Sequence, residues 1–113
     1  MKRRFRLTRS SDFKRVRNTG RSYAHPLVVL YAAASGETST RVGISASRAI
    51  GNAVQRNRAK RLLRAATAEL IPTVPPGVDL LLVARSPLLQ AKSPEVQAAL
   101  VSLLERAGFA TLS

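Results

Sequence analysis

Apolar positions recur along this chain with two different periods, and the change of period marks its secondary-structure elements. A helical spacing of 3.6 residues predicts a short first helix, which Ser10 or Ser11 is expected to cap and which ends at Gly20. The same spacing predicts a middle helix over 52–71 and a last helix over 93–107, with Ser93 as the cap of the last one. Strand-like runs lie between them over 21–34, 40–45 and 78–85, with room for an extra short strand near Arg21.

This order of helices and strands predicts one domain over residues 1–113, with an α/β (α+β) two-layer sandwich fold. The strands over 21–34 and 40–45 are separated by a turn, so we expect them to form a hairpin. The strand over 78–85 is almost continuously apolar, as strands buried on both faces are. A small mixed sheet follows, covered on one side by the middle and last helices. Its other face, or the groove beside the first helix, is left open.

The middle helix has two chemically different sides. Asn52 is a suitable cap at its start. On a helical wheel of ~100° per residue, the apolar side carries Ala59, Leu62, Leu63, Ala66 and Leu70. The basic side carries Arg56, Lys60 and Arg64 in one stack, extended by Asn57 and Arg61. Like charges four residues apart repel each other, so a helix with several such pairs is expected to face a polyanion.

The charge of the whole chain supports an anionic partner. Its 113 residues have a net charge of +13, and residues 1–64 hold 16 Lys and Arg against only Asp12 and Glu37. A solvated face is the alternative for the basic helix, but solvated faces usually mix charge signs, and no acid occurs between Arg41 and Ala68. Residues 1–9 are expected to form a flexible basic arm that orders on binding, with a solubilising tail as the alternative.

The composition also excludes several kinds of chemistry. The chain has no cysteine, one histidine and six scattered acids, so neither thiolate metal sites nor a paired-carboxylate site is expected. It contains no phosphate-binding loop, no secretory signal and no apolar run of membrane-spanning length. We therefore expect a soluble cytoplasmic protein, and any catalytic groups in its reaction are expected to come from a partner.

Three aromatic residues could serve as stacking surfaces for single-stranded nucleic acid. Phe13 lies on the first helix, and Tyr23 and Tyr31 lie in the strand region that follows. Bases stack on such rings in many proteins that bind single strands. An ordinary role in the core remains the alternative for each of them.

An ordered set of motifs resembles the bacterial ribonuclease P protein subunit. The central motifs are RVGIS at 41–45, IGNAV at 50–54 and RNRAKRLLR at 56–64. They are joined by SDFKRV at 11–16, Leu30-Tyr31 and PGVDL at 76–80. The resemblance implies a four-stranded sheet. It also implies a protein cofactor for a catalytic RNA that removes the 5′ leader of precursor tRNA, with Mg²⁺ held mainly by RNA.

The resemblance also implies which residues meet RNA. Phe13 and Tyr31 match aromatics of the leader cleft, to which we add Tyr23 and Arg17. Arg17 stands where such proteins often have a second aromatic, and Ala49 where they often have a basic residue, so leader binding is expected to be weaker in stacking and more electrostatic. The residues that match the motif facing the catalytic RNA are Arg48, Asn52, Arg56, Asn57, Arg58, Lys60, Arg61 and Arg64.

The expected partners are the ribonuclease P catalytic RNA and precursor tRNA, without DNA or a membrane, and the free protein is expected to be a monomer. A structural RNA-binding protein, such as a ribosomal protein, is the main alternative. A metal-dependent nuclease is disfavoured by the scarcity of acids. A membrane-surface protein is disfavoured because no amphipathic helix has a free apolar face.

Overall fold

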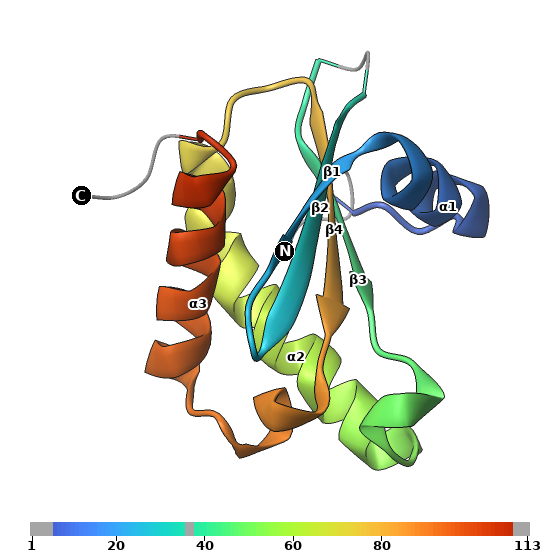
Figure 1. The fold of residues 1–113 in the computed structure, drawn as a ribbon, viewed down its shortest axis with the longest axis vertical. Coiled ribbons are helices and arrows are strands. Elements are labelled where there is room, and N and C mark those ends of the chain that lie inside the picture. The colour runs from blue at the N-terminus through green and yellow to red at the C-terminus, as the bar shows by residue number, and fades with distance from the viewer. Residues whose placement is uncertain (1–5, 36–37, 110–113) are drawn as a thin grey trace.

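The computed structural model describes residues 6–35 and 38–109. It contains a four-stranded sheet with helices on both faces (Figure 1). The helices and strands are α1 (Ser10–Thr19), β1 (Arg21–Ala24), β2 (Val28–Ala34), β3 (Arg41–Ser45), α2 (Ala53–Leu70), β4 (Val78–Ala84) and α3 (Ser93–Arg106). Three short 3-10 turns, Arg48–Ile50, Ile71–Thr73 and Ser86–Gln90, lie between them. The mixed α+β fold and the four-stranded sheet confirm the predicted fold class.

The strand order is β1-β2-β4-β3, which corrects one predicted pairing. β2 and β3 are not neighbours, because β4 lies between them, antiparallel to β2 and parallel to β3. The hairpin is instead formed by β1 and β2, so the extra strand near Arg21 is real. The physical reason is the apolar run of β4: a strand that must be buried on both faces takes a central position and displaces the local hairpin.

Most of the core lies between the sheet and the pair α2 and α3. Figure 1 shows these two helices on one side of the sheet and α1 alone on the other. Buried side chains from β2, β3 and β4, such as Leu30, Val42 and Leu82, pack there against Leu63 of α2 and Leu103 of α3. These side chains anchor α2 on the sheet and thereby fix which of its sides meets solvent.

The α1 face of the sheet has a much smaller core. Its buried residues are Leu7, Val16 and Leu81, with Phe13 and Tyr31 partly buried beside them. The flexible arm predicted over residues 1–9 falls partly outside the described residues, which begin at residue 6. Within the described part, Leu7 is only 3% exposed, and its N–H donates to the carbonyl of Val42 over 2.8 Å.

The predicted capping residue is confirmed at the start of α2 and is wrong at the starts of α1 and α3. The Asn52 side chain accepts from the Gln55 N–H, and the Gln55 side chain accepts from the Asn52 N–H, each over 2.9 Å. The serines expected to cap α1 and α3 do not do so. Ser10 and Ser93 are the first helical residues, and Arg9 and Lys92 occupy the capping positions. At α3 the Lys92 N–H instead donates to the Glu95 carboxylate over 3.2 Å.

Candidate nucleic-acid interface

Helix α2 buries one side and exposes the other, as its pattern predicts. Ala59, Leu63, Ala66 and Leu70 are buried against the sheet and α3. Leu62 is the exception among the predicted core residues. It is only partly buried, and it lines a shallow recess with Arg58 and Arg61 on the outer side of the helix. It lies ~100° from Leu63 around the helix, which carries it past the edge of the buried arc.

The eight residues predicted to face the catalytic RNA all lie on α2 or in the turn just before it. Arg48 and Asn52 are exposed at that turn, close to the start of the helix. The stack of Arg56, Lys60 and Arg64 is half-buried, at the edge between the packed and the open sides. Those fully exposed along the helix are Asn57, Arg58 and Arg61.

The half-buried basic residues are oriented by their surroundings. The Arg56 guanidinium donates to the carbonyl of Gly51 over 3.0 Å, which holds it near the start of the helix. Lys60 and Arg64 line a hollow of about 240 Å³, together with Arg6, Thr8, Phe13 and Ile44. We call this space the basic hollow. It joins the cations of α2 to the aromatic ring of α1, two features that lie far apart in the sequence.

Phe13 and Tyr31 come together on the α1 face of the sheet, but Tyr23 does not join them. Both Phe13 and Tyr31 pack against the small core and stay partly exposed. Tyr23 is paired in register with Leu30, so both side chains lie on the opposite face, where Tyr23 packs against the main core. The prediction that Tyr23 lines the same cleft is therefore wrong, because the hairpin register decides which face each residue takes.

Arg17 also lies at this site. Its guanidinium carbon is 5.8 Å from the centre of the Tyr31 ring, within the range of a cation–π contact. Arg17 is exposed and belongs to the last turn of α1. The structure thus places a cation over one of the two aromatics at the position where a second aromatic was expected.

A glycine of β3 makes room for the Phe13 ring. A β-carbon built on Gly43 would lie 2.6 Å from Cε1 of Phe13 and 3.2 Å from Cβ of Leu7. Such distances are shorter than van der Waals contact, so any larger residue would push the ring away from β3. Gly43 therefore sets how closely α1 approaches the sheet.

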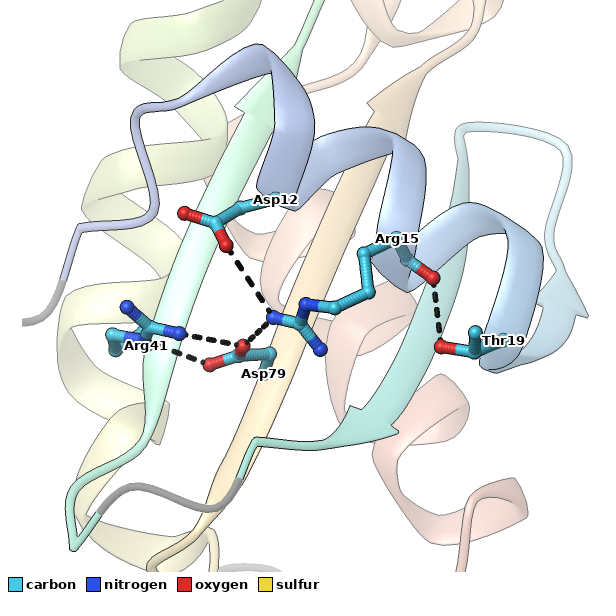
Figure 2. Close-up of polar contacts among 5 residues, drawn as sticks. All are labelled: Asp12, Arg15, Thr19, Arg41 and Asp79. Carbon is cyan, nitrogen blue, oxygen red and sulfur yellow. Dashed lines mark hydrogen bonds and ion pairs between the residues drawn. The ribbon is translucent and has the colours of Figure 1, made fainter.

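A buried ion-pair cluster also attaches α1 to the sheet, and the sequence pattern did not lead us to predict it. Asp79 at the start of β4 is fully buried, and its carboxylate accepts from Arg15 of α1 and from Arg41 of β3 (Figure 2). The Arg41 contacts measure 3.0 Å from Nε and 2.9 Å from Nη2. Nη2 of Arg15 also lies 3.7 Å from Oδ1 of Asp12. The available signal was a single acid inside the apolar run of β4, since such an acid needs cationic partners.

The described residues offer no place for a metal ion. No group of three or more His, Asp or Glu side chains gathers among residues 6–35 and 38–109. The buried carboxylate of Asp79 is engaged by two guanidiniums. The side chains of the described residues therefore do not fit a Mg²⁺ site. Within the same ranges, no helix is long and apolar enough to span a bilayer.

The sequence matches one known protein family over nearly its whole length. The model of the Ribonuclease P family matches residues 1–108. A ribonuclease P protein component from Chloroflexus aggregans is 40% identical over 108 residues, which cover 95% of this chain and 80% of that protein. The corresponding protein from an Exiguobacterium species is 39% identical, and the match covers 95% and 93% of the two chains.

Solved structures show the same fold. A Staphylococcus aureus RNase P protein mutant with defective mRNA degradation activity superposes with a TM-score of 0.84 at 28% identity, covering 94% of this chain and 90% of that one. The RNase P protein from Thermotoga maritima gives 0.79 at 28% identity, covering 89% and 96%. The likeness therefore includes the arrangement of the elements as well as the motifs.

Proposed function

The chain belongs to the ribonuclease P protein family and acts as a protein cofactor of that enzyme, and we propose which of its surfaces binds which RNA. Helix α2 binds the catalytic RNA. The α1 face of the sheet, with Phe13, Arg17 and Tyr31, binds the single-stranded 5′ leader of precursor tRNA. The chain supplies charge and shape, and the groups that break the phosphodiester bond belong to the RNA.

The observation that carries this proposal is the division of α2. Its apolar side is anchored in the main core, so the helix cannot turn its basic side away from solvent. Arg58 and Arg61 point outward without a described ion-pair partner, and planar guanidinium groups suit bidentate contacts to phosphate. Neutralising phosphates in this way reduces the repulsion between two RNA molecules that must approach each other.

The partial exposure of two aromatic side chains supports the proposal that the α1 face binds the leader. Phe13 and Tyr31 are anchored by one edge in the small core and keep part of their rings accessible. Rings held in this way can stack on unpaired bases without a large loss of side-chain entropy. Arg17 adds a cation beside Tyr31, which favours the phosphates of the same strand.

We further propose that the Mg²⁺ required for hydrolysis is held mainly by the RNA. The support is the family resemblance together with the donor set of this chain, in which Asp79 is already engaged by arginines. The partners of the chain are the catalytic RNA and precursor tRNA, and the free protein is a monomer. It works in the cytoplasm without contact with DNA or a membrane.

Reconstitution tests the proposal directly. The pure chain is mixed with precursor tRNA, with and without the catalytic RNA, at low Mg²⁺, and leader release is followed on a gel. Cleavage that needs both components is the expected result. Cleavage by the protein alone would indicate a nuclease with its own catalytic groups. No stimulation in any mixture would favour a structural RNA-binding protein instead.

A pair of matched variants tests whether the cations of α2 bind catalytic RNA more strongly than exposed cations elsewhere on the chain. Arg61→Ala removes an exposed cation from α2, and Arg21→Ala removes an exposed cation from β1. The affinity for catalytic RNA is expected to fall several-fold for the first variant only, with a shallower dependence on salt. Equal losses in both variants would contradict a specific role of α2.

A further inference from the structure

A second basic cleft borders the same N-terminal segment, residues 6–8, that lines the basic hollow. It has a volume of about 730 Å³, and four arginines from three parts of the chain line it. Arg6 and Arg9 come from the N-terminal segment, Arg15 from α1 and Arg41 from β3. We call it the arginine cleft. None of its residues belongs to the motif of α2 or to the aromatic pair Phe13 and Tyr31.

Among the described residues, the charges around this cleft do not cancel. Two of these residues are acids, Asp12 in the lining and Asp79 buried beneath it, against the four arginines. The Asp79 carboxylate accepts hydrogen bonds from Arg15 and Arg41 (Figure 2), and these contacts hold the two guanidiniums, which line the cleft, in place. The buried acid therefore orients cations that a flexible surface arginine would have to order on binding.

The other two arginines are available to a ligand. Arg6 and Arg9 are exposed, and neither side chain has an ion-pair partner among the described residues. The backbone of this segment is nevertheless fixed, because Arg6 forms a bridge with Val42 and the adjacent Leu7 is buried. Two free cations on an anchored segment face two oriented ones, which is the arrangement expected for binding phosphate oxygens.

The arginine cleft is continuous with the surface already assigned to RNA. Arg6, Leu7 and Thr8 line both this cleft and the basic hollow, where Phe13, Lys60 and Arg64 lie. A single RNA strand seated at Phe13 could therefore run over the short segment 6–8 into the arginine cleft. The path would stay cationic along its whole length, as in proteins that follow a single-stranded backbone.

We propose that the arginine cleft is a second RNA-binding site of this protein, which takes backbone phosphates of an RNA strand beyond the nucleotides that stack on Phe13 and Tyr31. This inference rests on the proposed function and extends it to a new surface. Because phosphates of the leader and of the catalytic RNA share the same chemistry, the test separates these two sources.

The test uses the double variant Arg6→Ala/Arg9→Ala and the single variant Arg9→Ala, because Arg6 also lines the basic hollow and Arg9 does not. A loss of affinity that is already present in Arg9→Ala belongs to the arginine cleft. Both variants leave the pairs of Asp79 intact, so folding is expected to be preserved, and this is checked by circular dichroism and a urea melt. The matched control, Arg21→Ala/Lys92→Ala, removes two exposed cations from β1 and from the start of α3. Three affinities are measured: protein for catalytic RNA, and holoenzyme for precursor tRNA with a short or a long leader.

The expected result is a loss of roughly 3- to 10-fold in one of these affinities for Arg6→Ala/Arg9→Ala, beyond any loss in the control. A loss confined to the long leader assigns the cleft to the leader. A loss already present with catalytic RNA alone assigns it to that RNA. In either case the salt dependence becomes shallower by about one phosphate contact or more.

Equal affinities for the variant and the control in all three measurements would overturn the proposal. That outcome remains distinct from failure of the proposed function, because the unmodified protein must first stimulate cleavage by the catalytic RNA. If it stimulates cleavage and the two double variants behave alike, only the arginine cleft is rejected.

Discussion

The two faces of the sheet are held by different forces. On the α2 and α3 side, a large set of aliphatic residues is buried, and charged side chains stay at its edges. On the α1 side, the buried apolar cluster among the described residues consists of Leu7, Val16 and Leu81, and the Asp79 ion pairs also link α1 to the sheet. Apolar burial is non-directional and stabilises the fold, whereas ion pairs orient particular side chains.

This difference explains where RNA can bind. A face covered by two helices has no room for a ligand, but it fixes the side of α2 that points outward. A face covered by one short helix leaves Phe13 and Tyr31 partly exposed and two basic spaces open beside them. The first face therefore provides stability, and the second provides most of the candidate binding surface.

The largest expected effect is on the well-packed face. Leu63→Ala removes a fully buried side chain of α2 and should lower the free energy of unfolding by about 2–5 kcal/mol. Leu62→Ala on the same helix is the control, because this residue is only partly buried, and about 1 kcal/mol or less is expected. Urea denaturation measures both. Equal losses would contradict the finding that Leu63 is buried in the core and Leu62 lies past the edge of the buried arc.

The second largest loss of stability is expected in the ion-pair cluster of Asp79, which links α1 to the sheet. Asp79→Asn removes the charge that Arg15 and Arg41 share, and a loss of about 1–3 kcal/mol is expected, since both arginines are partly exposed to solvent. The double-mutant cycle of Asp79→Asn with Arg41→Gln should show strong coupling in urea melts. Strictly additive losses would mean that the cluster contributes nothing beyond its individual residues.

A smaller effect on stability, but a clear effect on binding, is expected at Gly43. Gly43→Ala forces the Phe13 ring away from β3, because the new β-carbon would approach Cε1 to 2.6 Å. The holoenzyme should lose affinity for precursor tRNA by roughly 3- to 10-fold, with little change for mature tRNA that lacks a leader. Equal changes for the two RNAs would separate Phe13 from leader binding.

The smallest effect is expected at Arg17. Arg17→Ala removes an exposed cation over Tyr31 and should weaken leader-dependent binding by roughly 2- to 5-fold at moderate salt, with a weaker effect at high salt. Lys14→Ala, also on α1 and exposed, is the control for charge alone. An unchanged affinity in Arg17→Ala would show that this cation takes no part in holding the leader.

The buried and exposed sides of α2 could be predicted from the sequence, because they depend only on the spacing of residues within one helix. The cap at Asn52, the apolar stripe and the basic stripe are all properties of one helix, and helical geometry converts their spacing directly into sides. The one error on this helix, Leu62, lies at the boundary of the apolar arc, where the sequence cannot say how far the partner surface extends. The roles of the predicted RNA-facing residues stay predictions that the variants above address.

The α1 face was less predictable because it depends on contacts between distant segments. Phe13 meets Gly43, and Arg15 meets Asp79, across 30 and 64 positions of the chain. The separation of Tyr23 from Tyr31 follows from the register of a hairpin whose turn was not recognised. The arginine cleft joins segments that share no common motif.

The sequence by itself determined the anionic nature of the partner, the types of the main elements and the two sides of α2, since charge and periodicity need no knowledge of neighbours. Only the tertiary structure decided which strands pair, on which face each aromatic lies and how the arginines gather around Asp79. The physical reason is that strand order and the partners of a buried charge follow from competition among long-range contacts, in which the strongly apolar β4 took the position beside β2.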